Sequence, residues 1–450
     1  MDFIKRIYRS KSNMTEQDFE RGRKLFVVEG SISTTIANLS MGAFLAGYIQ
    51  YLGGAQEFSG IVLTIPMWSS IIQIFTPGIY ERLVSRKIFI AILAPLHRVM
   101  LGMMAFIPLI FNDTSTRLTV LFVLYTVSFL LLQMTNPAAL NWIMSLVPEN
   151  IRGRYYGRRD SYMLATSTIF SISAGFLLDY FKKFNSGDGF MIMYFVVLLL
   201  GISNFYFLGK IKEPTVNIRY YKHAETGEKI PAGANFKQIL IVPFLDEKFR
   251  KVLLLSSIWT ASIMIAIAYF PIYQVTELKL SYSYITLCLM LQMTTMIVFA
   301  RIWGRFADKH SWFKTLRICV LLLSGLHVVW FFTFQSTVFM IPLFYIWGGI
   351  CWSGINMSFF NIPYKYSPDK GKTIFISLFS SLMGVISLGA SLIGTGFVQL
   401  IGKSTFDIFG LKFTSMQFLF LISGIMMVCV GMYIKNNVEK NQLFKVDVTL

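Results

Sequence analysis

The feature that most constrains this chain is a series of long apolar runs. A run of about 20 apolar residues crosses a hydrocarbon core roughly 30 Å thick as a single helix. Of the 450 residues, 55% are hydrophobic and 14% are charged, whereas about 25% are charged in an ordinary soluble domain. The sequence therefore predicts an all-α integral membrane protein. Its twelve expected helices are 26–52, 57–80, 88–111, 118–147, 161–181, 190–209, 252–274, 283–303, 315–335, 339–363, 374–401 and 413–434.

The lysines and arginines lie between these runs, on alternate connections. Of the 41, 34 fall on the segments 1–25, 81–87, 148–160, 210–251, 301–317, 364–373 and 435–450. Because cytoplasmic connections are enriched in Lys and Arg, we expect both termini on the cytoplasmic side of the plasma membrane. The net charge of +18 then follows from membrane topology. Nucleic acid is not an expected partner.

The first six and the last six helices are separated by the longest hydrophilic stretch, 210–251. The two sets contain matching residues in the same order at an offset of 220: Asn136 and Asn356, Asn141 and Asn361, Pro148 and Pro368. A shared offset indicates a parallel duplication of a six-helix half. The expected parts are an N-terminal segment 1–25, an N-terminal half 26–209, a central loop 210–251, a C-terminal half 252–434 and a tail 435–450.

Two flanking segments are expected to form helices that lead into spans. Thr15 and Asp18 have the spacing of a capping box, which places a helix start before the first span. The stretch 235–255 is expected to form an interfacial helix, broken near Pro243, before the seventh span.

The connection between the eighth and ninth spans carries a motif. Its sequence, GRFADKHSWFKTLRI, resembles the signature G-R-x-A-D-[RK]-x-G-x-[RK] of the major facilitator superfamily through Gly304, Arg305, Asp308 and Lys309. After the fourth span, Pro148 is followed by Arg152 and Gly153, which resembles the P-x-x-x-R-G motif of the same superfamily. The surrounding stretch NPAALNWIMSLVPENIRGRYYGRRD is similar to a bacterial branch of transporters within it. In the first half, PGIYERLVSRK departs from the signature, with Ser85 in place of the second glycine.

The resemblance implies the major facilitator fold, with twelve transmembrane helices in two pseudo-symmetric six-helix halves. It also implies secondary active transport of a small solute by alternating access. No cofactor is implied, and we expect a monomer in the lipid bilayer. The motif residues would act in gating: Arg152, Gly153, Gly304, Arg305, Asp308 and Lys309. Topology alone also explains the lysines and arginines among them.

Polar side chains within the spans are candidates for the solute site, because such groups usually face the bundle interior or a water-filled cavity. The resemblance implies that helices 1, 4, 7 and 10 line this cavity. The candidates are Asn38, Gln73, Gln133, Asn136, Asn141, Tyr269, Gln292, Trp352, Asn356 and Asn361. The alternative is that the amides bond neighbouring helices or backbone groups freed by Pro137 and Pro363.

Charged residues within spans are a separate case. Glu29 lies inside the first span and could bind a coupling proton or pair with a cytoplasmic arginine. Arg98 lies mid-span in the third helix beside His97. A structural ion pair, a bend around Pro95 and solute contact are all open explanations for Arg98.

A transporter-like membrane receptor or accessory protein, which binds a ligand without translocating it, is the alternative to a transporter. An enzyme is not expected, because the four histidines and four cysteines form no catalytic or metal-binding pattern. The sequence lacks a GxxxxGK[ST] phosphate-binding loop.

Overall fold

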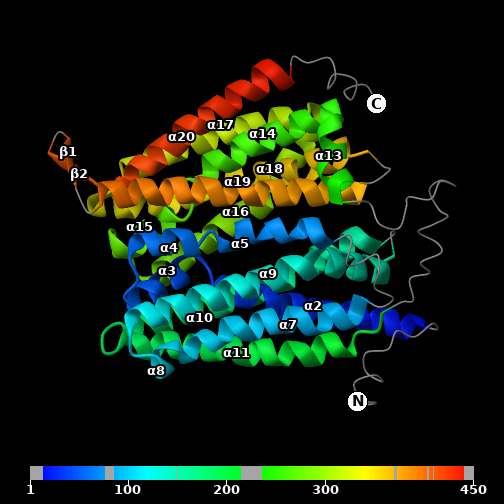
Figure 1. The fold of residues 1–450 in the computed structure, drawn as a ribbon, viewed down its shortest axis with the longest axis horizontal. Coiled ribbons are helices and arrows are strands. Elements are labelled where there is room, and N and C mark those ends of the chain that lie inside the picture. The colour runs from blue at the N-terminus through cyan, green and yellow to red at the C-terminus, as the bar shows by residue number, and fades with distance from the viewer. Residues whose placement is uncertain are drawn as a thin grey trace. The chain divides into compact units, whose positions relative to one another are not determined.

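The computed structural model describes residues 14–76, 86–148, 151–213, 236–368, 372–402, 405–408 and 410–439, and these form a helical protein (Figure 1). The described residues contain 11 helices long and apolar enough to cross a membrane. A further bent pair raises the total to 12 if it counts as one span. The predicted all-α membrane fold is therefore confirmed.

The chain divides into two compact units. Unit 1 comprises Met1–Gly54 and Phe75–Asn235, and unit 2 comprises Ala55–Ile74 and Phe236–Leu450. The second span therefore packs within unit 2, although the sequence order groups it with the first six helices. Close backbone approach explains this packing, because a Cβ atom on Gly384 would lie 2.7 Å from the backbone nitrogen of Ile71.

Unit 1 contains five spans. Its helices are α2 (Glu16–Leu39), α3 (Gly42–Tyr51), α7 (Arg86–Met103), η2 (Met104–Phe106), α8 (Ile107–Ile110), α9 (Thr114–Leu146), α10 (Arg152–Phe181) and α11 (Ser186–Lys210). The helices α2 and α3 form the bent span, with an angle of 47°. The bend lies where Gly42 has φ +59, a left-handed conformation that glycine adopts at little cost.

Unit 2 contains the remaining seven spans. Its first span, the second of the chain, is formed by α4 (Gln56–Val62), α5 (Ile65–Trp68) and η1 (Ser69–Phe75). The other elements are α13 (Phe236–Leu245), α14 (Glu247–Met264), α15 (Tyr269–Thr276), α16 (Tyr282–Lys309), α17 (Trp312–Phe331), η4 (Gln335–Met340), α18 (Ile341–Tyr366), α19 (Lys372–Ile401), β1 (Phe406–Ile408), β2 (Leu411–Phe413), α20 (Ser415–Tyr433) and η5 (Ile434–Val438).

The helix boundaries repeat at the offset found in the sequence. The ends of α9 and α18 are 220 residues apart, and α10 and α19 are both 30 residues long with starts 220 residues apart. The packing repeats as well. Within unit 1, α2 packs on α10 and α7 packs on α9 and α11; within unit 2, α14 packs on α19 and α17 packs on α18 and α20. The two pseudo-symmetric halves are therefore confirmed.

Three local features refine the sequence prediction. The capping box is confirmed, because the Asp18 backbone N–H donates to the Thr15 hydroxyl and the Thr15 N–H donates to the Asp18 carboxylate, both at 3.3 Å. Pro243 lies inside α13, and the helix breaks three residues later, where Asp246 caps α14. An antiparallel β-hairpin, β1–β2, precedes α20 and was not predicted.

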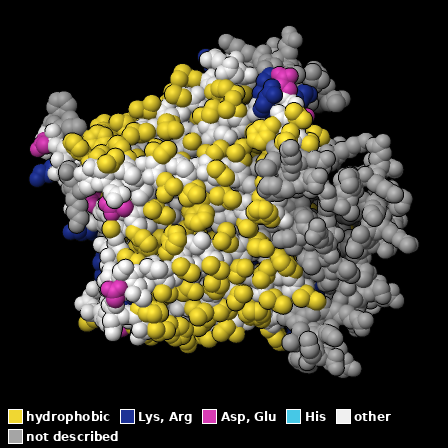
Figure 2. Space-filling view, viewed as in Figure 1, with side chains coloured by type: hydrophobic (Ala, Val, Ile, Leu, Met, Phe, Trp, Pro, Cys, Tyr) yellow, Lys and Arg dark blue, Asp and Glu magenta, His cyan; other side chains and the backbone are white. Residues whose placement is uncertain are grey.

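The outer surfaces of the spans are apolar. Hydrophobic side chains cover much of the face shown in Figure 2. Large exposed side chains lie on several helices, including Leu109, Ile169 and Phe195 in unit 1 and Leu343 and Ile425 in unit 2. Such exposure would be costly in water but is expected where side chains contact lipid tails.

Small residues bring α7 and α11 into close contact in unit 1. A Cβ atom on Gly102 would lie 2.3 Å from the Leu198 Cα atom, and one on Gly201 would lie 3.0 Å from the backbone of Arg98. Helices in membranes commonly pack through such small residues, because they allow the backbones to approach.

We expect Gly102→Ala to force α7 and α11 apart and to lower the free energy of unfolding by about 1–3 kcal/mol, as overpacking does. The measurement is loss of helical circular dichroism on titration with sodium dodecyl sulfate. Gly389→Ala is the matched control, because no atom lies within 4 Å of its Cβ position. Equal effects of the two substitutions would contradict the close approach.

Candidate functional site

In unit 1, the candidate amides lie on α2 and α9. Asn38 on α2 and Gln133 on α9 are half-buried, and Asn136 on α9 is exposed. The Asn136 side-chain amide donates to the Gln133 side-chain oxygen at 3.3 Å. The side chain of Asn141 lies outside the described residues. The structure therefore brings Gln133 and Asn136 together on one face of α9.

In unit 2, the equivalent amide has the same placement. Asn356 is exposed on α18, and it lies ten residues before the end of its helix, as Asn136 does in α9. Asn361, in contrast, is half-buried and donates to the Met357 carbonyl at 2.8 Å. Asn136 and Asn356 are therefore the duplicated pair whose amides are exposed in their own units.

The remaining candidates of unit 2 are more enclosed. Tyr269 is 1% exposed and donates its hydroxyl to Thr395 at 3.1 Å. Gln292 is half-buried, and its side-chain nitrogen would lie 3.5 Å from a Cβ atom on Gly348. Gln73 in η1 is half-buried. The structure thus gives Tyr269 and Gln292 packing positions within unit 2.

An aromatic cluster adjoins Asn356. The half-buried Trp352 lies one helical turn before it on α18. Its ring centroid is 6.1 Å from that of Trp259 on α14, and Trp259 stacks on Phe359 at 5.5 Å. Trp352 was predicted, whereas Trp259 and Phe359 were missed because nothing in one sequence pairs α14 with α18. The two rings of α18 in this cluster therefore lie about one helical turn before and after the exposed amide.

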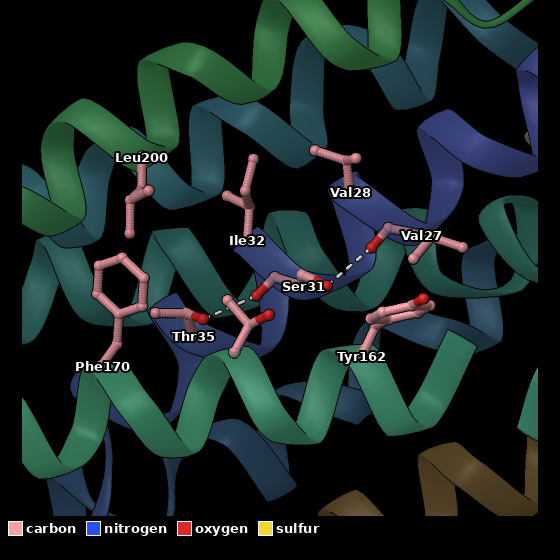
Figure 3. A pocket seen from close by; sticks show the side chains of 9 residues that line it. Val27, Val28, Ser31, Ile32, Thr35, Tyr162, Phe170 and Leu200 are labelled. Carbon is pink, nitrogen blue, oxygen red and sulfur yellow. Dashed lines mark hydrogen bonds between the residues drawn. The ribbon is translucent and has the colours of Figure 1, made fainter. Parts of the chain in front are cut away.

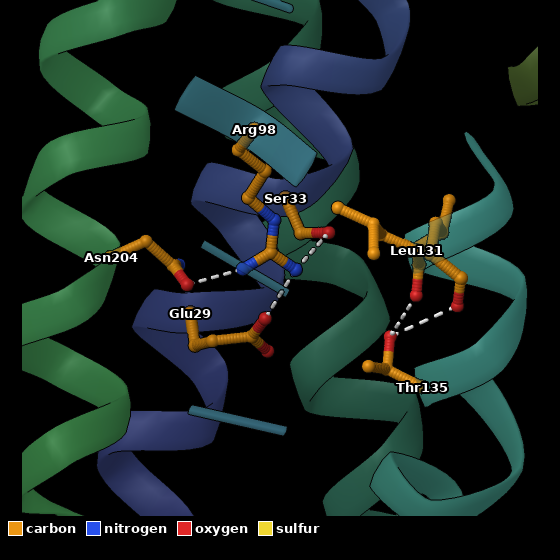
Figure 4. Close-up of polar contacts among 7 residues, drawn as sticks. Glu29, Ser33, Arg98, Leu131, Thr135 and Asn204 are labelled. Atoms are coloured by element: carbon orange, nitrogen blue, oxygen red, sulfur yellow. Dashed lines mark hydrogen bonds and ion pairs between the residues drawn. The ribbon is translucent and has the colours of Figure 1, made fainter. Parts of the chain in front are cut away.

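Unit 1 contains a buried charge cluster (Figure 4). The Arg98 Nη2 atom donates to the Glu29 carboxylate at 2.7 Å and to the Ser33 hydroxyl at 2.8 Å. Its Nη1 atom donates to the side-chain oxygen of Asn204. Arg98 is 4% exposed, Glu29 is 8% exposed and Asn204 is fully buried. The cluster joins α2, α7 and α11.

The sequence had singled out Glu29 and Arg98 without pairing them. The structural ion pair left open for Arg98 is present, and the partner of Glu29 is this mid-span arginine rather than a cytoplasmic one. Opposite charges within two spans of one half are a usable signal for the pairing of Glu29 with Arg98. The neutral partners Ser33 and Asn204 were missed. His97 faces elsewhere, with its Nδ1 atom 2.6 Å from the Ser128 hydroxyl.

The motif residues lie at helix ends. Gly304, Arg305, Asp308 and Lys309 occupy the last turns of α16 rather than a loop. Gly304 is half-buried, and the three charged residues are exposed. Arg152 and Gly153 begin α10, nine residues before the predicted span, and the Arg152 side chain lies outside the described residues.

We expect removal of one partner of the buried pair, in Arg98→Leu or Glu29→Leu, to cost about 3–5 kcal/mol of stability, because an uncompensated charge remains buried. The double variant should cost less than the sum of the two. The measurement is a double-mutant cycle on unfolding in detergent. The exposed pair Lys24–Glu20 is the control and should couple by less than about 1 kcal/mol. Additive costs at Arg98 and Glu29 would contradict the pairing.

Comparison with known proteins gives one family. Residues 30–391 match the sequence profile of the Major Facilitator Superfamily. No curated protein sequence matches the chain significantly.

Several solved structures share the fold at low sequence identity. The nucleoside transporter NupG is 10% identical with a TM-score of 0.60, covering 92% of this chain and 98% of that one. A D-xylose-proton symporter is 12% identical with a TM-score of 0.60, covering 94% and 96%. A bacterial homologue of the iron transporter ferroportin, in an inward-facing state, is 12% identical with a TM-score of 0.64, covering 94% and 99%.

Proposed function

The chain belongs to the Major Facilitator Superfamily and is a multi-pass secondary transporter, and from this premise we propose that its solute is a neutral polar molecule with a ring. The observation that carries the proposal is the pair of exposed amides at equivalent positions of the two halves, Asn136 and Asn356. A polar side chain at membrane depth usually faces a water-filled cavity. An amide both donates and accepts hydrogen bonds, as the hydroxyl groups of a sugar or a nucleoside require.

Charge and aromatic content support a neutral solute. Glu29 and Arg98 neutralise each other within unit 1, so neither offers a free charge to a solute. The half-buried Trp352 supplies an apolar ring, which can stack on the ring of a solute. Two of the structures with the same fold bear the names of a nucleoside transporter and a xylose symporter. A nucleoside or a pentose is therefore the first class of solute to test.

We also propose that transport takes place by alternating access in the plasma membrane. The distribution of Lys and Arg favours cytoplasmic termini, and with this topology the C-terminal end of α16 and the start of α10 would lie on the cytoplasmic side. Arg152, Gly153 and the motif at Gly304 to Lys309 are the proposed gating positions. The protein would act as a monomer on a small solute.

We expect Asn136→Ala and Asn356→Ala each to weaken transport about threefold to tenfold, because one hydrogen bond to a neutral group contributes about 0.5–1.5 kcal/mol. The double variant should show little flux. The measurement is uptake of radiolabelled nucleosides and pentoses by proteoliposomes.

Asn112→Ala is the control, since this amide is exposed in the connection between α8 and α9. Unchanged uptake in the double variant would contradict the site. Solute binding by the wild-type protein without flux would favour the receptor alternative. A fall in thermal stability without a change in solute affinity would assign the amides to helix packing.

Glu29 is the proposed site of a coupling proton. Protonation would break its ion pair with Arg98, whose guanidinium keeps acceptors in Asn204 and Ser33. The D-xylose-proton symporter with the same fold supports testing a proton first.

We expect Glu29→Gln to retain solute exchange between equal concentrations and to lose accumulation driven by a pH gradient, because the amide cannot carry the proton. Proteoliposome counterflow and gradient-driven uptake measure the two properties. Asp160→Asn, an exposed acid on α10, is the control and should retain both. Accumulation by Glu29→Gln at the wild-type level would restrict Glu29 to a structural role.

A further inference from the structure

An apolar cavity lies on the surface of unit 1, where side chains of α2, α10 and α11 point into the space between these helices (Figure 3). Its volume is about 450 Å³. The lining residues are Val27, Val28, Ser31, Ile32, Thr35, Tyr162, Thr166, Phe170 and Leu200. Val28, Tyr162 and Phe170 are exposed, so the cavity opens outward.

The polar residues of α2 do not make this cavity hydrophilic. Ser31 donates its hydroxyl to the Val27 carbonyl at 2.9 Å, and Thr35 donates to the Ser31 carbonyl at 2.8 Å. Both hydroxyl protons are therefore used inside the helix. The surface that remains suits a hydrocarbon chain, because it has few groups for which water would be the better partner.

Two arginines flank one end of the cavity. Arg158 lies one turn before Tyr162, with its guanidinium carbon 5.6 Å from the ring centroid and Nη2 3.4 Å from the hydroxyl. Arg159 lies over α2, because a Cβ atom on Gly30 would be 3.1 Å from its Nη2 atom. The distribution of Lys and Arg assigns this end to the cytoplasm.

The arginines have unused hydrogen-bonding capacity. Among the described residues, the buried Nε atom of Arg159 has no hydrogen-bond partner, and its contact with Asp160 is long, at 3.5 Å. On α11, Lys210 lies over the ring of Tyr206 at 3.9 Å, so a second Tyr and cation pair stands at the same end. Tyrosines with nearby cations are typical of the level of lipid headgroups.

We propose that this cavity binds an anionic phospholipid of the cytoplasmic leaflet. Arg158 and Arg159 hold the phosphate, since a guanidinium matches two phosphate oxygens at once. One acyl chain lies between α2, α10 and α11. The site explains the arginines of α10 that neither the solute site nor the gating motif uses.

The test compares lipids on the detergent-purified protein by native mass spectrometry and thermal shift. Phosphatidylglycerol is expected to remain bound and to raise the melting temperature, as a ligand of the folded state does. Phosphatidylcholine with the same chains and glycerol 3-phosphate should do so much less. Arg158→Gln/Arg159→Gln should weaken phosphatidylglycerol binding about 25-fold, because each basic residue near an anionic lipid surface contributes about fivefold.

Two further variants separate the parts of the site. Thr166→Phe fills the cavity and should also weaken binding of phosphatidylglycerol, with the arginines intact. Arg301→Gln removes an exposed arginine of α16 and should leave binding unchanged. Equal binding of phosphatidylcholine, an equal loss in Arg301→Gln, or equally tight binding of glycerol 3-phosphate would overturn the proposal.

A measurement on the wild-type protein tests the proposal even if the variants fail to fold. A phosphatidylglycerol with a photoreactive group on its acyl chain should label peptides of α2, α10 or α11. Labelling confined to other helices would overturn the proposal.

Discussion

Hydrocarbon provides no hydrogen-bonding partner, so every polar group within a span must find one in the protein. The cluster around Arg98 shows how this requirement shapes unit 1. Its guanidinium is placed among a carboxylate, a hydroxyl and an amide from two neighbouring helices. Along α2, the hydroxyls of Ser31 and Thr35 bond to carbonyls of their own helix. These hydrogen bonds form without water, although the Arg98 Nε and Asn204 Nδ2 atoms have no partner among the described residues.

Close helix packing makes these partners reachable. The backbones of α7 and α11 approach at Gly102 and Gly201, and this approach brings Asn204 within reach of Arg98. In unit 2, α16 and α18 approach in the same way at Gly349, where a Cβ atom would lie 2.6 Å from the Gln292 carbonyl. Glycines in these helices therefore determine which polar side chains can meet.

Much of the fold can be predicted from the sequence because the bilayer restricts it to helices of known length. The spans, the capping box at Thr15 and the duplication all follow from local patterns or from the offset of 220 residues. The pairing of Glu29 with Arg98 could not be predicted in the same way, since it depends on how α2 and α7 are rotated against each other. The β1–β2 hairpin was missed because its few residues lie next to a long apolar run.

For a related reason, the sequence could predict which residues are candidates for the site but not which of them are exposed. Residue type and depth pick out Asn136 and Asn356, but they equally pick out Tyr269 and Asn361, which bond to Thr395 and to the Met357 carbonyl. Only the rotation of each helix distinguishes an exposed amide from a bonded one. A single sequence predicts that rotation poorly for inner helices, because apolar residues occur on all of their faces and give only a weak hydrophobic periodicity.

The proposed solute site also separates charge from the solute. Alternating access requires each half to move largely as a rigid body, and Arg98 ties three helices of unit 1 together. Because this pair lies within one unit, movement of one half against the other need not break it. The exposed amides carry no charge, so exposing them to the proposed solute cavity would cost far less than exposing an ion. In the proposed mechanism, the charged pair stays within one half while neutral groups meet the solute.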